Sequence, residues 1–363
     1  MPAHIRARNN ISKDPSRESE GFDEKGFLMI FFQIQAAHNL SYIPDLVSMV
    51  YGEENFYYVT IDRAASPAAA RAVVSFLAPY PNIVVNTDAF VTWGGVSQVD
   101  VMLSGMNFMI QLRKFKYYIN ISDSDVPLWS LARLCNFLRD AEASGRLAFI
   151  THWKPDLTKE PVTLGDEVGT TETSFRPDVK FVIDKRIKAY FVHASTSPIV
   201  KAHMRVSFVC AEQPAVKTLF VRPMMPFEEV ARRVFLSSFP IYIGRQWMIL
   251  HCELLERMFS DRRFLLCYKM LSDMFIPDEM LLQTAILNIE EDKGAISNES
   301  LRFRRGDPQS ITDADLPELR TCSAAFARKI SIPLSSSLLD YVRDVCSNEI
   351  RSFHDFRLKH RAQ

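Results

Sequence analysis

Short apolar runs alternate with amphipathic stretches through the first half of the chain, and this alternation restricts the fold more than any other feature. The runs of strand length are Phe27–Gln35, Phe56–Ile61, Asn82–Asn86, Tyr117–Ile121 and Leu147–His152. Between them, apolar residues spaced three and four apart indicate helices at Ser66–Leu77, Ser97–Leu112 and Leu128–Ala141. Such alternation predicts an α/β fold, in which a mainly parallel sheet is flanked by helices on both faces.

The second half of the chain begins with a polar stretch, Lys154–Asp178, that is typical of a long surface loop. Further strands are predicted at Lys180–Ile183, Ala189–Val192 and Lys217–Val221, and helices at Met248–Phe259, Phe264–Met274, Asp278–Leu287 and Ser335–Ile350. No repeat or linker divides the chain. We therefore expect a flexible leader over 1–25, a single large domain over 26–332, and a C-terminal helix with a basic tail over 333–363.

Composition excludes several classes of protein. The 363 residues are 47% apolar, and 43 Lys and Arg balance 43 Asp and Glu, so a globular chain without a general nucleic-acid-binding surface is expected. The six cysteines have no metal-binding spacing. The apolar run Phe27–Ile34 is about eight residues long, whereas a membrane span needs roughly 20, and the charged stretch before it does not resemble a signal peptide.

In an open sheet of this kind, ligands bind beyond the carboxyl ends of the strands. The polar or aromatic residues at those positions are His38, Asp62, Trp93 and Asp123–Asp125. No G-x-G-x-x-G follows a strand, and the chain contains neither a P-loop nor a G-x-S-x-G turn. A dehydrogenase of the usual dinucleotide-binding kind, a P-loop NTPase and a serine hydrolase are therefore disfavoured.

Seven short strings, in order along the chain, resemble the core-2/I-branching β-1,6-N-acetylglucosaminyltransferase and peptide O-xylosyltransferase family, glycosyltransferase family 14. They are Phe56–Arg63, Val91–Gly95, Tyr118–Pro127, Ile243–Trp247, Pro277–Glu279 with Gln283 and Thr284, Asn298–Phe303, and Phe326–Lys329. Trp-Gly-Gly and Gln-Trp are more similar to the xylosyltransferases. The resemblance implies a GT-A-like fold and inverting transfer of N-acetylglucosamine, xylose or glucuronic acid from a UDP-sugar to a hydroxyl of a glycan or protein.

Inversion requires a carboxylate that deprotonates the acceptor hydroxyl, and the resemblance assigns this role to Glu279. Helical periodicity separately puts Glu279 in the first turn of a helix that begins at Pro277-Asp278. There Asp278 is expected to cap the helix, and the helix dipole favours a charged carboxylate. The competing interpretation is an ordinary first-turn glutamate.

Negative charge grows on the departing diphosphate, and the resemblance implies that basic side chains rather than a metal neutralise it. Lys329 matches the family lysine. Arg305 is the candidate arginine, with Arg304 or Arg302 as substitutes, and a solvated basic turn is the alternative interpretation.

The remaining candidates belong to the expected donor pocket. Asp62 matches a family aspartate expected to contact the uridine, although it could instead cap a turn. His38 occupies a family histidine position, and a structural histidine is the equal alternative. Trp93 and Trp247 are candidates for stacking on a sugar or base, and the alternative is that they are core residues. Arg245 stands where the family usually has serine, so it is a candidate contact for a donor phosphate or an acidic acceptor.

Asp123 stands where the family usually has glycine, which creates a literal Asp123-Ser124-Asp125 at a strand end. Other GT-A enzymes bind manganese with Asp-x-Asp at this position, so a metal-dependent transferase using Asp123 and Asp125 stays open. A second Asp-x-Asp, at Asp313-Ala314-Asp315, shows that the tripeptide alone is weak evidence. A non-catalytic carbohydrate-binding relative is a further alternative. Relatives in animals and plants are usually tethered in the Golgi by an N-terminal membrane span, which this chain does not display.

Overall fold

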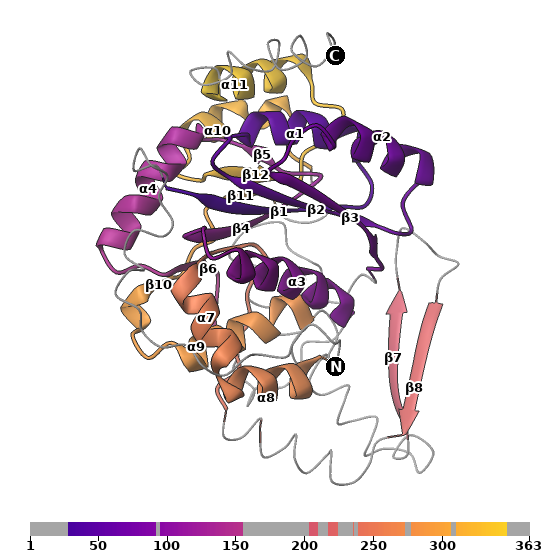
Figure 1. The fold of residues 1–363 in the computed structure, drawn as a ribbon, viewed down its shortest axis with the longest axis vertical. Coiled ribbons are helices and arrows are strands. Elements are labelled where there is room, and N and C mark those ends of the chain that lie inside the picture. The colour runs from indigo at the N-terminus through magenta and orange to yellow at the C-terminus, as the bar shows by residue number, and fades with distance from the viewer. Residues whose placement is uncertain are drawn as a thin grey trace.

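A computed structural model of the protein describes residues 28–91, 95–154, 203–209, 217–223, 235, 239–272, 277–305 and 310–346. Its centre is a seven-stranded sheet in the order β10-β6-β9-β4-β1-β2-β3 (Figure 1). The strands are β1 (Ile30–Ala36), β2 (Phe56–Asp62), β3 (Ile83–Ala89), β4 (Tyr117–Ser122), β6 (Ala148–Ile150), β9 (Met248–His251) and β10 (Ile296–Ser297). Strand β9 runs antiparallel to both of its neighbours, and the other pairs are parallel. The mainly parallel, mixed sheet expected for a GT-A-like fold is confirmed.

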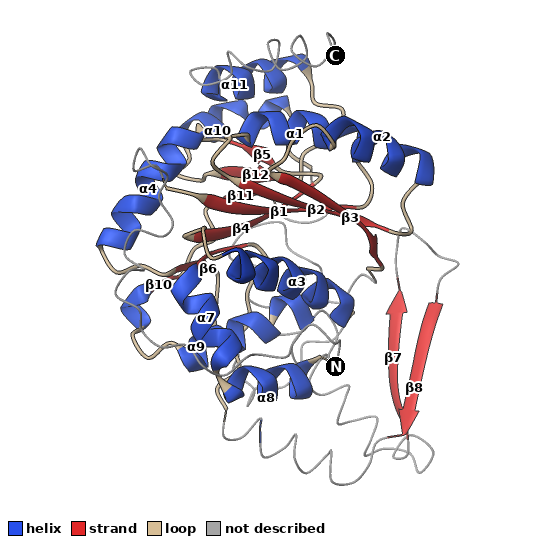
Figure 2. Ribbon diagram, in the orientation of Figure 1, coloured by secondary structure: helices blue, strands red, loops and turns tan. Residues whose placement is uncertain are grey.

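Helices cover both faces of this sheet (Figure 2). One layer contains α1 (Ile43–Val50), α2 (Pro67–Leu77), α4 (Leu131–Ala143), α10 (Leu316–Thr321) and α11 (Ser336–Cys346). The other contains α3 (Val96–Leu112), α7 (Cys252–Ser260), α8 (Arg262–Leu271) and α9 (Leu281–Ile289). Short 3₁₀ turns lie at η3 (Leu40–Tyr42), η5 (Pro277–Glu279), η6 (Lys293–Ala295) and η7 (Asp313–Asp315).

Two smaller sheets complete the described structure. In the first, β11 (Arg302–Arg304) lies parallel to β12 (Phe326–Arg328), which pairs antiparallel with β5 (Val126–Pro127). Because β5 follows β4 after only three residues, this small sheet is tied directly to the carboxyl end of a central strand. The second is a hairpin of β7 (His203–Val209) and β8 (Lys217–Pro223).

Alternation along the central strands divides the core into two apolar clusters, one under each helical layer. In β1, Phe32 and Ile34 join the cluster that contains α1 and α2, whereas Phe31 joins the cluster that contains α3. The polar side chain of Gln33 is fully buried. Its amide donates to Val101 O at 2.8 Å and its oxygen accepts from the Tyr118 hydroxyl, so the buried polar atoms have partners.

Two predicted helices begin later than expected. Met248–Phe259 was predicted as one helix, but its first four residues form β9 and α7 begins at Cys252. A short apolar run fits a buried strand and a buried helix equally, and pairing with β4 and β6 decides this case. Asp278–Leu287 was also predicted as one helix; instead α9 begins at Leu281, after η5. Met280 occupies the N-cap position of α9 with φ of −139°, so Asp278 lies within η5 and not, as had been expected, at the N-cap of α9.

Other differences from the expected elements follow from size and context. Helices α1 and α10 and the small sheet of β5, β11 and β12 were not anticipated, because elements of two to eight residues carry little periodic signal. The leader, the tail after 346, the predicted strands Lys180–Ile183 and Ala189–Val192, Trp93, and the polar stretch beyond Lys154 lie outside the described residues. Among the helices that are described, none has the length and apolar character to cross a membrane.

Gly105 generates a prediction about the contact between α3 and the sheet. A Cβ atom there would overlap the amide of Gln33, whose buried hydrogen bonds leave it little freedom to move. Replacing a helical glycine by alanine usually stabilises by about 1 kcal/mol. Here we expect Gly105→Ala to lower the free energy of unfolding by about 1–3 kcal/mol, as overpacking does. Urea denaturation followed by tryptophan fluorescence measures it.

Ser104→Ala is the matched control, since Ser104 is the preceding residue of the same helix and is only partly buried. Its free energy of unfolding should stay within about 0.5 kcal/mol of the unmodified protein. A Gly105→Ala variant that is as stable as the unmodified protein would contradict the proposed close contact.

Candidate active site

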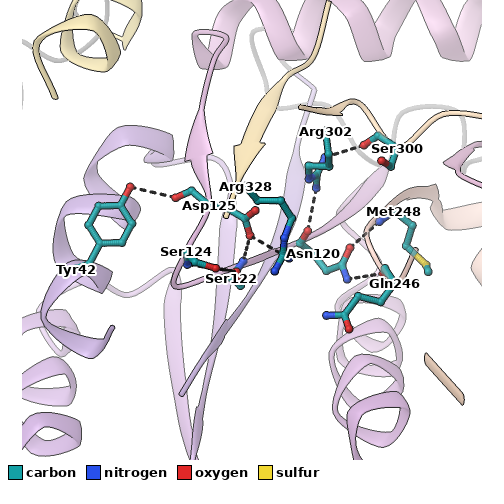
Figure 3. Close-up of polar contacts among 10 residues, drawn as sticks. All are labelled: Tyr42, Asn120, Ser122, Ser124, Asp125, Gln246, Met248, Ser300, Arg302 and Arg328. Atoms are coloured by element: carbon teal, nitrogen blue, oxygen red, sulfur yellow. Dashed lines mark hydrogen bonds and ion pairs between the residues drawn. The ribbon is translucent and has the colours of Figure 1, made fainter. Parts of the chain in front are cut away.

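Polar side chains gather beyond the carboxyl end of β4, as the strand-end rule predicts (Figure 3). The turn Asp123–Asp125 follows β4 and leads directly into β5. Both aspartates are buried, which is unusual for carboxylates unless they have partners. Those partners come from two different parts of the chain.

Asp123 binds the loop that follows β1. Its Oδ2 atom accepts hydrogen bonds from the backbone N–H groups of Ala37, His38 and Asn39, at 2.9, 2.7 and 2.8 Å. Three N–H donors on one carboxylate oxygen are charge-assisted bonds, which are stronger than those between neutral groups. The His38 side chain is exposed on this loop, so Asp123 fixes the backbone from which His38 projects.

Asp125 is paired instead with a buried arginine. Its Oδ2 atom accepts from the backbone N–H of Ser122 and lies 3.9 Å from Nη1 of Arg328. The guanidinium of Arg328 lies 3.7 Å from the centre of the Trp247 ring, so one face of that ring is already covered. Burial lowers the pKa of Arg328, and the charges of Asp125 and Asp123 oppose that change.

Three arginines come from neighbouring positions of the small sheet. Arg304 of β11 is paired with Arg328 of β12, and alternation puts Arg302 on the same face as Arg304. Arg302 Nη2 donates to the carbonyl oxygen of Asn120 at 2.9 Å. Burial lowers the pKa of Arg304 to about 10; the positive charges of Arg245 and Arg328 act in the same direction, and Glu279 opposes them.

The negative charge of Glu279 acts on both Arg304 and Arg328 and opposes the lowering of their pKa values. Glu279 is half-buried in η5, and its carbonyl oxygen accepts from Gly244 N at 2.9 Å. A Cβ at Gly244 would overlap the carbonyl of Thr151 at the end of β6, so only glycine permits this approach. The close approach therefore fixes the backbone of Glu279 relative to the central sheet.

The segment that carries Arg245 and Trp247 is held by buried polar groups. Arg245 N donates to Thr151 Oγ1 at 2.9 Å, and Arg245 O accepts from Gln283 Nε2 at 2.8 Å. Asn120 of β4 is fully buried; its Nδ2 donates to Gln246 O at 3.0 Å, and its Oδ1 accepts from Met248 N at 2.9 Å. The Asn120 side chain thereby continues the pairing of β4 with β9.

Arg305 lies apart from its neighbour Arg304. Its Nε donates to Asp315 Oδ1 at 2.8 Å, and its Nη2 lies 2.5 Å from Glu318 Oε2, next to α10. Lys329 is exposed immediately after Arg328, and its carbonyl oxygen accepts from Ile311 N at 2.7 Å. Of the predicted arginines, Arg304 and Arg302 are therefore the ones brought beside Arg328.

Asp62 lies at the end of β2, which β1 separates from β4. Its Oδ1 atom accepts from Ala64 N at 2.9 Å, so this aspartate caps the turn that follows the strand. Its expected place in a uridine pocket stays a prediction.

The donor set around Asp123 and Asp125 does not fit a divalent cation. Asp123 Oδ2 faces three N–H groups and Asp125 Oδ2 faces a guanidinium. Asp125 Oδ1 is buried without a hydrogen-bond partner among the described residues, but a single such oxygen does not supply the several oxygen ligands that a hard cation requires. Within the described ranges, no three His, Cys, Asp or Glu side chains are grouped to hold a metal ion.

Sequence reasoning missed Arg328, Asn120 and Gly244 as parts of this arrangement. Arg328 lies next to Lys329 in the string Phe326–Lys329, but the string alone does not show which of these two positively charged side chains is buried. Asn120 carried a usable signal, since an amide within the apolar run Tyr117–Ile121 needs buried partners.

Comparison with known proteins agrees with the local strings. Human xylosyltransferase 2 is 25% identical over 145 residues, covering 38% of this chain and 17% of the relative. Drosophila melanogaster xylosyltransferase oxt is 30% identical over 101 residues, or 27% and 11%. Bovine beta-1,3-galactosyl-O-glycosyl-glycoprotein beta-1,6-N-acetylglucosaminyltransferase is 25% identical over 126 residues, or 34% and 28%. The matched stretches thus span well under a third of these relatives.

A crystal structure of S. aureus TarS aligns with a TM-score of 0.24 and 9% identity, covering 38% of this chain and 40% of that one. The family model described as Core-2/I-Branching enzyme matches residues 30–161 and 187–327, which is well over half of the sequence. That match covers the turn Asp123–Asp125, Glu279 and the arginines of β11, so the chain belongs to the Core-2/I-Branching enzyme family.

Proposed function

We infer that this protein is an inverting glycosyltransferase that moves a sugar from a UDP-sugar to a hydroxyl of a glycan or protein. Family membership supports sugar transfer in general terms. The observation that carries the finer proposal is the backbone contact that holds Glu279 against Gly244, next to Arg245, where the charge of Glu279 acts on the half-buried Arg304 and the buried Arg328. One carboxylate close to several guanidinium groups suits a reaction in which a proton is removed and a diphosphate departs.

Glu279 is the base in this proposal. It accepts the proton of the acceptor hydroxyl while that oxygen attacks the anomeric carbon, and the bond to UDP breaks on the opposite side. The sugar is N-acetylglucosamine, xylose or glucuronic acid. Gly244 and Thr151 support the role, because they fix the backbone of Glu279 and so limit its motion relative to the bound sugar.

Arg302, Arg304 and Arg328, which lie at neighbouring positions of the small sheet, provide positive charge for the departing diphosphate. Among the described residues, Nε and Nη1 of Arg328 are buried without a hydrogen-bond partner, and such groups call for an explanation. A bound anion would supply it, and would also offset the burial that lowers the pKa of Arg304. In this proposal Arg304 takes the role first expected of Arg305, Lys329 joins it, and Asp62 and His38 lie toward the nucleotide.

Glu279→Gln tests the base. Glutamine keeps the size of the side chain but cannot accept the proton, so turnover should fall on the order of 10²–10⁴-fold. Binding of UDP, measured by isothermal titration calorimetry, should be retained. The rate is measured by release of UDP from a panel of UDP-sugars, with water or a sugar alcohol as acceptor.

Glu291→Gln is the matched control, because Glu291 is an exposed glutamate that follows α9. Its rate should equal that of the unmodified protein. If Glu279→Gln turned over at the same rate as the control, Glu279 would have no part in the chemistry. A protein that binds UDP but shows no transfer or hydrolysis would instead favour a non-catalytic carbohydrate-binding relative.

Arg304→Gln and Arg305→Gln distinguish the last residue of β11 from the residue that follows it. Arg304 lies with Arg328 and Glu279, so its loss should weaken UDP binding about tenfold or more, the usual effect of removing a hydrogen bond to a charged group. Arg305 pairs with Asp315 and Glu318, so its loss should change UDP affinity by less than about twofold. The reverse order of effects would return the diphosphate-binding role to Arg305.

A further inference from the structure

We propose that Asp123 and Asp125 are a pair of positioning residues that hold two segments at the candidate active site: the loop after β1, here called the first wall, and the end of β12 with Arg328, here called the second wall. Asp123 orders the loop after β1, and Asp125 orients Arg328 on β12. This inference rests on the proposed function in one respect, namely the identity of the ligand that the two walls bind. The turn Asp123–Asp125 occupies the position at which an Asp-x-Asp could coordinate a metal, but its carboxylates bind the protein's own cationic and N–H groups.

The first wall depends on Asp123. All three N–H groups that bind Oδ2 belong to consecutive residues, Ala37 to Asn39, so one oxygen sets the course of the whole loop. The effect of the Asp123 carboxylate is to order the backbone that carries His38.

The second wall depends on Asp125. The pairing of β12 with β5 places Ala327 opposite Val126, so Arg328 and Asp125 lie next along the two strands. The pair is buried, and Coulomb attraction across 3.9 Å is much stronger there than in water. Asp125 and the Trp247 ring together constrain where the Arg328 guanidinium lies, and hence where its positive charge faces Arg304 and Glu279.

Contacts of its main-chain atoms also connect the turn Asp123–Asp125 to both walls. The Tyr42 hydroxyl donates to Asp125 O at 3.1 Å, which joins the turn to η3 after the first wall (Figure 3). Ile330 N donates to Ser124 O at 3.0 Å, which joins it to the chain after β12. The turn thus contacts both walls through main-chain as well as side-chain atoms.

Amide hydrogen exchange tests the first wall without any ligand. Asp123→Asn keeps the shape but loses the charge, and Asp123→Gly removes the side chain. We expect exchange at the amides of His38 and Asn39 to rise about tenfold or more in Asp123→Gly, and less in Asp123→Asn. Asp313→Asn is the control, because Asp313 is the exposed aspartate of the second Asp-x-Asp, and it should leave these amides unchanged. Unchanged exchange in Asp123→Gly would overturn this half of the proposal.

A double-mutant cycle tests the second wall. Asp125→Asn should weaken UDP binding about tenfold in the unmodified protein, and should have no further effect in an Arg328→Gln background, because Asp125 acts through Arg328. A purely structural role would lower affinity equally in both backgrounds, and that result would overturn the proposal. If Asp125→Asn does not fold, Asp125→Glu, which keeps the charge, is used in the same cycle.

Chelation distinguishes a metal ligand from a positioning residue. UDP affinity and turnover of the unmodified protein should be the same after EDTA treatment as after addition of manganese. If EDTA abolished UDP binding, manganese restored it, and Asp125→Asn raised the manganese concentration required, the pair would be metal ligands. If the unmodified protein did not bind UDP at all, the proposed function would fail, whereas the exchange experiment would still decide the role of Asp123.

Discussion

The buried attraction between Asp125 and Arg328 joins the two sheets on which the active site depends. Asp125 follows a strand of the central sheet, and Arg328 ends a strand of the small sheet, so the pair crosses the boundary between them. A buried charge without its partner is costly, which means that neither residue is tolerated well alone. Trp247 covers the guanidinium, and Arg304 and Glu279 lie within reach of its charge. The geometry of the proposed chemistry therefore follows from how this one pair is held.

Buried amides and a glycine position the other side of the site. Where the backbone pairing of β4 with β9 ends, the side chain of Asn120 forms hydrogen bonds to the facing main chain. These bonds fix the segment that contains Trp247. Gly244 lets that same segment approach the end of β6 and the carbonyl of Glu279. These contacts are short and buried, and such groups hold a unique arrangement because an unpaired polar atom there is expensive. The proposed base is thus carried by a constrained backbone, although it lies in a 3₁₀ turn.

The positive charges of the candidate site are only partly balanced by carboxylates, which suits an anionic ligand. Arg245, Arg304 and Arg328 influence one another, and burial lowers the pKa of both Arg304 and Arg328. Asp125 balances part of this charge, but Asp123 is directed to backbone N–H groups. Positive charges that lie near one another and are partly removed from solvent are tolerated where a ligand of opposite charge completes the site. The departing diphosphate of a UDP-sugar has that charge.

The sequence by itself determined the alternation of strands and helices, because apolar spacing reports directly which face of each element is buried. It also identified the strand-end positions His38 and Asp123–Asp125, and the strings that contain Glu279 and Lys329, whereas Arg304 was only a substitute for Arg305. Only the tertiary structure decided that Met248–His251 pairs as a strand, that Arg304 and Arg305 point to different partners, and that Asp123 and Asp125 bind N–H and guanidinium groups. Each of those outcomes depends on which distant segment lies opposite a residue, and local spacing does not encode that.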